Sequence, residues 1–479
     1  MEPTRVREKR RDHVKGGRLE FLVPHLLRSQ LLRPGFVRLS LRLGAAQQMP
    51  SWAKLQFTHA GVSPEDLDRV LGRITSLVSW VDEWEGLGRE HEQGGRDALA
   101  LARRADAARR YLAASAAYNF AQYVIFLDIA RKRQLHESCM RAYSLAAPLL
   151  SPPARTFEVV FRRHPMRGYL RLPRGPRPAP VVVLFNGTNA VKEELHWWGE
   201  ALLERGLAVI TFDGPGLGQT WNRLSMVAEP RPVGVAILDH IESWPELDAD
   251  AVAFFGMSLG GYLSIRMASH DPRVKAVAAI SPPYSADIYW NLTLASMRRE
   301  LAALYNLPEH EMGVAIERIT LAGILPRLAC PLFLAGGGRD LITPAEEAQR
   351  IFEDARCERE LVYYPGGAHD CFNVLADLRP RVVSWLARRL ERHARPAAQL
   401  PEWVPAEGWM AAEAVDLDFG EALEGEARRP AWVDPAPPRP VLVAARSAWG
   451  WPWARRAAGL LPVVQRAAPE RFQPAVSDE

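Results

Sequence analysis

Residues 251–261 of this 479-residue chain read AVAFFGMSLGG, an apolar run that leads into a serine between glycines. The apolar run predicts a buried β-strand, and a helical pattern begins at Tyr262. A serine on a tight strand-to-helix turn needs small neighbours, because the turn brings the backbone close to adjacent elements. Gly256 and Gly260 meet this need. The pattern predicts a nucleophile elbow with Ser258 as the nucleophile; the alternative is a turn without chemistry.

Further apolar runs of strand length lie on both sides of this elbow. Strands are predicted at residues 156–161, 169–172, 181–185, 208–212, 251–255, 274–280, 332–335 and 361–364, the first two as a hairpin. Helices are predicted between the later strands, at residues 194–204, 235–243, 259–269, 344–354 and 374–393. Continuous apolar strands that alternate with helices are typical of a mostly parallel sheet with helices on both faces. The sequence therefore predicts an α/β fold.

The composition divides the chain into four parts. Residues 1–50 form a basic N-terminal segment, residues 51–150 a helical cap domain and residues 151–395 the α/β core. Residues 396–479 form a C-terminal extension that contains proline, alanine and tryptophan, and its tryptophans argue against complete disorder. Residues 285–328 are too long for a simple crossover and have a helical pattern, so we expect them to form a lid over the sheet.

Helical periodicity sets the cap domain apart from the core. Ser63 and Pro64 predict the start of a helix, and apolar residues from Leu67 to Val81 follow on one face. A second helical segment is predicted from residue 98 to residue 131, and Tyr118 lies on a stripe of polar and aromatic side chains within it. That stripe is interpreted either as helix packing or as a surface that faces substrate.

Composition narrows the class of protein. The 60 basic and 56 acidic residues give a net charge of +4, which is no argument for a nucleic-acid partner. No apolar run reaches the length of a membrane span, about 18 residues, and no apolar segment follows the basic start as in a signal peptide. Four cysteines without a CxxC pair fit reduced thiols. We therefore expect a soluble cytoplasmic protein that acts on a small molecule, with no cofactor, metal, nucleic acid or membrane as partner; a homodimer stays open.

A serine nucleophile needs a base that takes its proton and an acid that orients the base. Asp340 follows the strand at 332–335 and lies in a glycine-rich loop at its carboxyl end. His369 follows the last strand, at 361–364, directly before the final helix. Asp370 is adjacent to the histidine, but its side chain is not expected to reach the ring easily. Chain order therefore predicts Asp340 as the acid and His369 as the base.

The negative charge that forms on an attacked carbonyl needs backbone donors. The N–H of Leu259, directly after the nucleophile, is the first candidate. The second is expected in the loop after the strand at 181–185, where either Thr188 or Gly187 donates. The glycine-rich turn at 212–218 lacks the Lys-Ser/Thr pair of a phosphate loop, so it is interpreted as a structural turn that borders the pocket.

Three motifs carry a resemblance to a known family. They are Phe185-Asn186-Gly187-Thr188 with Lys192-Glu193-Glu194, Phe212-Asp213-Gly214-Pro215-Gly216, and Gly256-Met257-Ser258-Leu259-Gly260-Gly261. They resemble the α/β-hydrolase family that contains the 2,6-dihydroxypseudooxynicotine hydrolases, the fungal polyketide-shortening hydrolases and the fermentation-respiration-switch esterases. The resemblance covers roughly residues 61–393 and implies an α/β-hydrolase fold with an N-terminal helical cap and an inserted helical lid.

The resemblance also implies site residues. It is consistent with the triad given above and places a pocket between cap and core. An additional acidic residue assists carbon–carbon cleavage in one branch of the family, and Asp287 lies near the corresponding region. Asp287, Tyr118 and Tyr289 are the expected substrate-binding residues. The basic start and the tryptophan-bearing tail depart from the family pattern.

More than one reaction fits the same triad. Several members of the family cleave a carbon–carbon bond next to a ketone, and others cleave esters. A cap and a lid would enclose an apolar pocket that excludes water, which favours a carbon–carbon hydrolase acting on a β-diketone or a polyketide-like or aromatic substrate. The alternatives are a carboxylic ester hydrolase, an acyl transferase or cyclase of secondary metabolism that uses the same acyl-serine, and a binding protein on a hydrolase fold.

Overall fold

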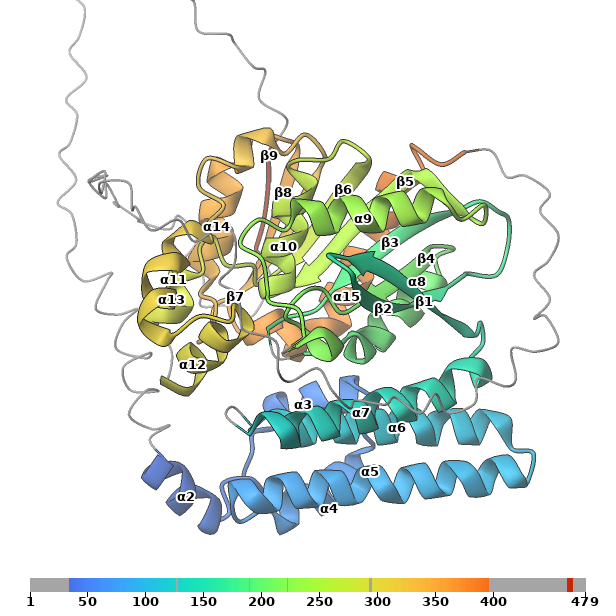
Figure 1. Ribbon diagram of the computed structural model, residues 1–479, viewed down its shortest axis with the longest axis vertical. Helices are drawn as coiled ribbons and strands as arrows, with labels where there is room; N and C mark the ends of the chain where they lie inside the picture. The colour runs from blue at the N-terminus through green and yellow to red at the C-terminus, as the bar shows by residue number, and fades with distance from the viewer. Residues whose placement is uncertain are drawn as a thin grey trace, which may run out of the picture.

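The predicted sheet is present in the computed structural model, which describes residues 34–125, 128–188, 190–221, 223–292, 295–395 and 463–467. Within these residues nine strands form one sheet in the order β1-β2-β4-β3-β5-β6-β7-β8-β9 (Figure 1). The strands are β1 (Ala154–Phe161), β2 (His164–Arg171), β3 (Ala179–Phe185), β4 (Ala208–Phe212), β5 (Leu247–Met257), β6 (Val274–Ile280), β7 (Leu332–Gly337), β8 (Arg359–Tyr364) and β9 (Val463–Ala467). Each strand that the sequence predicts is confirmed.

The middle of the sheet is parallel. β3 pairs in parallel with β4 and β5, and parallel pairing continues through β6, β7 and β8. The β1–β2 hairpin joins β4 antiparallel at one edge, and β9 joins β8 antiparallel at the other. Because the carboxyl ends of parallel strands meet at one edge of a sheet, the loops after β3, β5, β7 and β8 lie near one another there.

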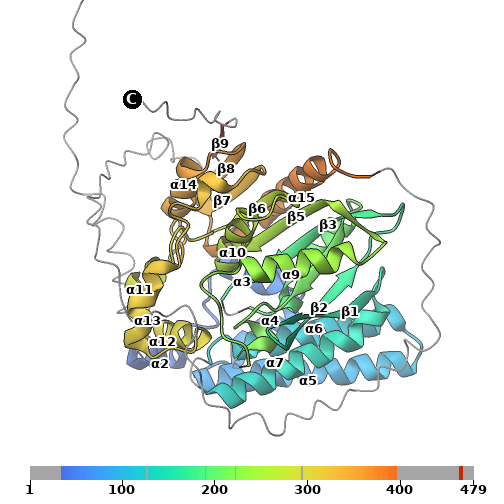
Figure 2. The ribbon, with the colours of Figure 1, turned by 45° about the horizontal axis from the view of Figure 1, so that its top comes forward.

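Helices cover both faces of the sheet. α9 (Arg231–Glu242), α10 (Leu259–Ala268) and α14 (Ala345–Asp354) pack on one face, and α8 (His196–Leu203) and α15 (Leu375–Leu390) pack on the other (Figures 1 and 2). Side chains of β5 alternate between the two faces: Phe254 belongs to the first core and Phe255 to the second. Burial on both faces is the reason why these strands read as continuous apolar runs.

A layer of helices lies below the α/β core in Figure 1. Its members are α3 (Ser51–His59), α4 (Pro64–Arg73), α5 (Leu77–Ala100), α6 (Arg104–Gln122) and α7 (Ile129–Ala146), preceded by α2 (Pro34–Arg42). The centre of this layer is aromatic. The ring of Trp84 is buried, and its centroid lies 5.3 Å from that of Phe57 and 5.2 Å from that of Phe120.

The helix boundaries in this layer differ from the prediction in two places. Ser63 caps α4 as predicted. The single helical face expected from Leu67 to Val81 is broken, because α4 ends at Arg73 and Ser76 starts α5 by exchanging hydrogen bonds with a serine three residues later. The segment expected at 98–131 is likewise divided among α5, α6 and α7. Hydrophobic periodicity does not report such caps, so it merged neighbouring helices.

The interval between β6 and β7 is helical, as its apolar spacing predicts. It contains α11 (Asp287–Leu292), α12 (Ala295–Leu304) and α13 (Glu309–Ala315), which lie beside the core (Figure 1). Buried side chains of Leu301, Tyr305 and Met312 join the core cluster of α9 and α10. The N–H of Met226 donates to the carbonyl oxygen of Leu304 at 2.7 Å. The role of this insertion as a lid stays a prediction.

The structure describes one piece of the C-terminal extension, and this piece is a strand that the sequence did not predict. β9 covers the otherwise open edge of β8, and Nε of Arg466 lies 3.0 Å from Oε2 of Glu360. The partial disorder expected for the extension and its tryptophans fall outside the described residues, as do residues 1–33. Among the helices that the structure describes, none has the length and apolar character to span a bilayer.

Candidate active site

The turn between β5 and α10 has the backbone shape of a nucleophile elbow. Ser258 has φ 51° and ψ −124°, a region that non-glycine residues rarely occupy. A Cβ on Gly256 would lie 2.2 Å from the backbone of Gly260. A Cβ on Gly260 would lie 2.2 Å from the carbonyl oxygen of Phe185. The glycines are therefore required by close backbone contacts, as the sequence predicts, and the turn holds Ser258 at the carboxyl edge of the sheet.

His369 lies on the loop after β8 and Asp340 on the loop after β7, and their side chains are in contact. Nδ1 of His369 lies 2.9 Å from Oδ2 and 3.0 Å from Oδ1 of Asp340. Oδ1 of Asp340 also accepts the backbone N–H groups of Ile342 and Thr343, each at 2.8 Å. The loops approach closely because residue 337 is glycine: a Cβ on Gly337 would lie 2.5 Å from the backbone of the facing loop. This is the arrangement that the predicted roles of acid and base require.

The loop after β3, of which residues 186–188 and 190 are described, lies against Ser258, and we call it the oxyanion loop after the role predicted for it. A Cβ on Gly187 would lie 3.5 Å from Cβ of Ser258. Leu259 is the first residue of α10, where backbone N–H groups have no partner within the helix. Both expected positions of the oxyanion donors therefore adjoin Ser258. Gly187 and Thr188 stay alternatives for the second donor.

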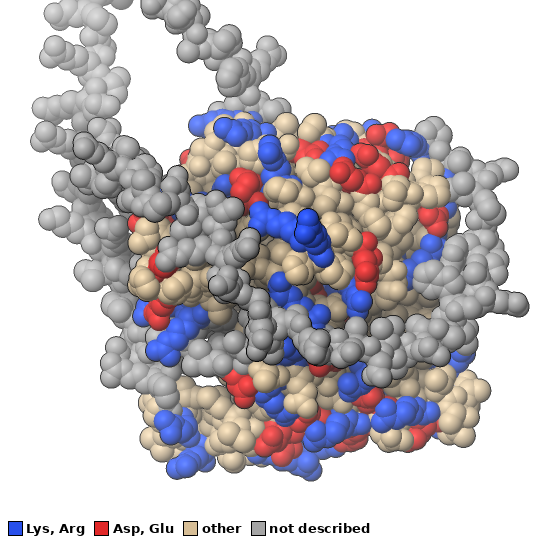
Figure 3. Space-filling model, viewed as in Figure 1, with Lys and Arg blue, Asp and Glu red and all other residues tan. Residues whose placement is uncertain are grey.

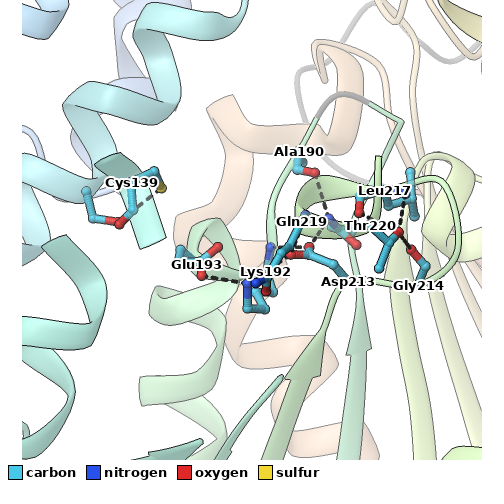
Figure 4. A network of polar contacts seen from close by, with 11 residues as sticks. Cys139, Ala190, Lys192, Glu193, Asp213, Gly214, Leu217, Gln219 and Thr220 are labelled. Atoms are coloured by element: carbon cyan, nitrogen blue, oxygen red, sulfur yellow. Dashed lines mark hydrogen bonds and ion pairs between the residues drawn. The ribbon is translucent and has the colours of Figure 1, made fainter. Parts of the chain in front are cut away.

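Buried Asp213 ties the oxyanion loop to the turn after β4 (Figure 4). Its Oδ1 accepts the N–H of Lys192 at 2.9 Å, and its Oδ2 accepts the Lys192 ammonium at 2.9 Å and the N–H of Gln219 at 3.1 Å. Nδ2 of Asn186 donates to the carbonyl oxygen of Ala190 at 2.7 Å and to Oδ1 of Asp213 at 3.3 Å. The glycine-rich turn, through Asp213, thus holds the oxyanion loop in place.

The charges of this network depend on one another. Burial disfavours the Lys192 ammonium, but Asp213 and Glu193 outweigh burial and raise the pKa of Lys192. Nζ of Lys192 lies 2.8 Å from Oε1 of Glu193. Burial raises the pKa of Glu193 against the opposing charge of Lys192. The lysine is therefore charged inside the protein and relies on Asp213.

We expect Asp213→Ala to lower the free energy of unfolding by about 3–5 kcal/mol, because it removes a partner from the buried charge of Lys192 and from the N–H of Gln219. Asp213→Asn keeps the shape and one acceptor, so its loss should be smaller. Urea unfolding measures both variants against Asp68→Ala, whose carboxylate side chain is 68% exposed. An Asp213→Ala protein as stable as the wild type would contradict this structural role.

The cap helices contact the loops that carry the candidate triad. Trp52 of α3 stacks on Phe372 in the loop after β8, with ring centroids 6.4 Å apart. Tyr123, at the end of α6, donates its hydroxyl to Oε2 of Glu194 at 2.5 Å, and Nδ2 of Asn119 donates to the same oxygen at 3.0 Å. Glu194 belongs to one of the three motifs of the family resemblance, whereas no sequence pattern marks Tyr123 or Asn119. The cap therefore lies on the carboxyl edge of the sheet, on the side of the candidate triad.

Asp370 requires a correction. Its place directly after His369 in the sequence predicts that its side chain does not reach the ring easily, yet Oδ2 of Asp370 lies 3.7 Å from Nε2 of His369. The reason is the backbone, which is left-handed at both Asp370 (φ 53°) and Cys371 (φ 53°) and turns the carboxyl back toward the imidazole. Burial, opposed by the charge of His369, raises the pKa of Asp370 to about 6.

The structure places the expected substrate-binding residues in different surroundings. The hydroxyl of Tyr118 donates to Oε2 of Glu92 at 3.0 Å inside the cap, so its contacts support the packing interpretation and correct the substrate-facing one. Asp287 begins α11, and its charge adds to burial in raising the pKa of Glu347. The side chain of Tyr289 lies outside the described residues.

A mostly parallel sheet with a serine at an elbow, and with a carboxylate and a histidine on the loops after β7 and β8, defines the α/β-hydrolases. The chain is an enzyme of this class. The esterase FrsA-like family model matches residues 50–306, more than half of the chain, and the chain belongs to this family. An acetyl xylan esterase model matches residues 233–389.

Individual relatives agree with this assignment and confirm the resemblance. The chain is 30% identical over 363 residues to 2,6-dihydropseudooxynicotine hydrolase of Paenarthrobacter nicotinovorans, covering 74% of this chain and 96% of that protein. It is 32% identical over 219 residues to 20-hydroxy-prefusarin hydrolase of Gibberella moniliformis, covering 43% of this chain and 52% of that protein. The crystal structure of 2,6-dihydroxy-pseudo-oxynicotine hydrolase matches with a TM-score of 0.66 and 27% identity, over 73% of this chain and 99% of that one.

Proposed function

We propose that this hydrolase cleaves a carbon–carbon bond next to a ketone, in a β-diketone or a polyketide-like or aromatic substrate. The observation that carries the proposal is the cap seated on the catalytic loops, where Trp52 stacks on Phe372 and Tyr123 bonds to Glu194. A covered site limits the access of water to a reactive, carbanion-like leaving group. The relatives named as hydrolases of pseudooxynicotine and prefusarin compounds support a small organic substrate.

The first half of the proposed reaction makes an acyl-serine. Nε2 of His369 takes the proton of Ser258 as its oxygen attacks the substrate carbonyl, while Asp340 orients the ring and stabilises the imidazolium. The backbone N–H of Leu259 and a second N–H from the oxyanion loop donate to the oxygen of the tetrahedral intermediate. When the intermediate collapses, the carbon–carbon bond breaks and its electron pair leaves as an enolate.

The second half releases both products. The enolate takes a proton and becomes a ketone, and the imidazolium of His369 gives up the proton that it took from Ser258. The remaining acyl group stays on Ser258. His369 then removes a proton from a water molecule, which attacks the acyl-serine, and the carboxylic acid leaves. One water molecule is consumed for each bond cleaved, and the free serine is restored.

Ester hydrolysis is the second candidate. The names of the two matching family models, esterase FrsA-like and acetyl xylan esterase, favour it. The same triad would serve, with the imidazolium of His369 protonating a leaving alkoxide. The two reactions differ only in the leaving group. The chemical class of the substrate therefore determines which of the two reactions takes place.

A β-diketone probe and an ester probe with the same acyl group test the choice between carbon–carbon cleavage and ester hydrolysis. We expect the wild-type protein to convert the β-diketone probe into a carboxylic acid and a ketone, because the covered site and its donors suit an enolate leaving group. The masses of the products identify the bond that was cleaved, and Ser258→Ala gives the background. Turnover of the ester probe alone would contradict carbon–carbon cleavage and leave the esterase function standing.

A further inference from the structure

Asp370 lies at the catalytic histidine but has no part in the mechanism above. Asp340 holds Nδ1 of His369 at 2.9 Å, whereas Oδ2 of Asp370 lies 3.7 Å from Nε2, the nitrogen that exchanges protons with serine and substrate. A backbone hydrogen bond of Ser258 also acts on the Asp370 carboxyl, in the direction that lowers its pKa. The imidazole therefore has a carboxyl group near each nitrogen, although one carboxylate suffices to orient it.

The backbone is strained where it presents this carboxyl. Asp370 (φ 53°, ψ 13°) and Cys371 (φ 53°, ψ 25°) are consecutive left-handed residues, a conformation that residues other than glycine, asparagine and aspartate rarely adopt. The N–H of Asp370 donates to Oγ of Ser281 at 3.1 Å, and the N–H of Cys371 donates to the carbonyl oxygen of Ala368 at 2.9 Å. These two hydrogen bonds hold the turn through its backbone, and neither of them involves the Asp370 carboxyl.

The surroundings of the carboxyl suit a proton donor. Oδ1 of Asp370 is buried and has no hydrogen-bond partner in the part of the chain that the structure describes, while 27% of the side chain is exposed. The charged groups that act on it are His369, which lowers its pKa, and Asp340 and Glu194, which raise it. On the cap side, burial and Glu194 raise the pKa of Tyr123, and the charge of Asp370 adds to that increase. Burial is the largest influence and sets the pKa at about 6, so a fraction of the carboxyl carries a proton near neutral pH.

We propose that Asp370 donates the proton that the leaving enolate takes up, an inference that rests on the proposed carbon–carbon cleavage. The bond between the attacked carbon and its neighbour breaks, and the electron pair becomes an enolate whose charge lies largely on the ketone oxygen. The protonated carboxyl of Asp370 gives its proton to the oxygen of this enolate and becomes a carboxylate, and the resulting enol tautomerises to the ketone. Nε2–H of His369 then returns a proton to the carboxylate, and the neutral imidazole is ready to activate water.

An ester has no need of this second donor. Its leaving oxygen is bonded directly to the attacked carbon, within reach of the imidazolium of His369. The enolate oxygen of a β-diketone lies three bonds from the attacked carbon, so a donor displaced from Nε2 is better placed to reach it. A carboxyl 3.7 Å from Nε2 meets that requirement.

Asp370→Asn tests the inference because it keeps the shape of the side chain and removes the acid. With paired β-diketone and ester probes, we expect the ratio of the two kcat values, diketone over ester, to fall by about 100-fold or more, with little change in KM. Asp370→Glu should restore part of the ratio. Thermal melting and the rate of fluorophosphonate labelling of Ser258 show that the fold and the nucleophile are intact in each variant.

The pH dependence of kcat gives an independent test of Asp370 as the proton donor. Because the donor must be protonated, wild-type kcat for the diketone should fall as the pH rises through the pKa of Asp370, and this limb should disappear in Asp370→Asn. Equal losses on both probes would mean that Asp370 merely positions His369, and an unchanged ratio would mean that it is not the donor. Either result overturns the inference while wild-type cleavage of the diketone stands. A wild type that cleaves only the ester would overturn the proposed function and this inference together.

Discussion

Replacing Ser258 with alanine is expected to lower kcat by about 10⁴- to 10⁶-fold and to leave the fold intact. The loss follows from the proposed acyl-serine, which cannot form without the hydroxyl oxygen. The fold should survive because Gly256 and Gly260 keep the close backbone contacts of the elbow, and alanine is smaller than serine. His369→Ala should be comparably inactive, since residues of a triad act as a unit. Turnover of the β-diketone and ester probes measures both variants.

A matched control comes from the same helix. Ser269→Ala removes a hydroxyl that donates to the carbonyl oxygen of Ile265 at 2.8 Å, at the far end of α10 from the elbow. This variant should keep near wild-type turnover and should still form a fluorophosphonate adduct on Ser258. A Ser258→Ala enzyme with more than about a tenth of the wild-type rate would refute the assignment of the nucleophile.

Strands and elbow were predictable because local sequence determines them. β3 to β8 are buried on both faces, so each reads as an apolar run that needs no knowledge of its neighbours. The elbow needs Gly256 and Gly260 because a Cβ at either position would collide with the backbone. Both glycines are visible in the sequence on either side of Ser258. Asp340 and His369 were located because parallel strands bring the loops at their carboxyl ends to one edge of the sheet.

Features that depend on distant contacts were not predictable in this way. Tyr123 and Glu194 meet through folding of the cap onto the core, although they are 71 residues apart in the sequence. β9 pairs with β8 across a separation of about a hundred residues, and Arg466 and Glu360 are 106 residues apart. The position of the Asp370 carboxyl depends on two consecutive left-handed residues, which no hydrophobic pattern reports.

The two carboxyl groups at His369 differ in their surroundings, and that difference separates their roles. Asp340 is 5% exposed and its Oδ1 accepts two backbone N–H groups, which hold the carboxyl in a fixed position beside the imidazole. Asp370 lacks such donors on Oδ1, and burial raises its pKa. One carboxyl with backbone donors and one buried carboxyl oxygen without them, both at the same histidine, fit an orienting group beside an acid.

Asp340→Asn is expected to lower kcat by about 10⁴-fold with KM close to that of the wild type. The two N–H groups at 2.8 Å from Oδ1 require an oxygen there, so the new amide nitrogen takes the place of Oδ2, 2.9 Å from Nδ1 of His369. An amide N–H donates to Nδ1 and leaves the ring proton on Nε2. The imidazole is then held in the tautomer that cannot accept the proton of Ser258.

Asp370 should not rescue this variant, because its carboxyl lies on the Nε2 side of the ring and cannot reach Nδ1 at the same time. Asp377→Asn is the matched control: that carboxylate pairs with Arg381 on the surface, and its loss should leave kcat near the wild-type value. Initial rates over a range of substrate concentrations separate kcat from KM. An unchanged kcat in Asp340→Asn would show that another carboxylate orients His369, and Asp340→Asn combined with Asp370→Asn or Asp287→Asn would then identify it.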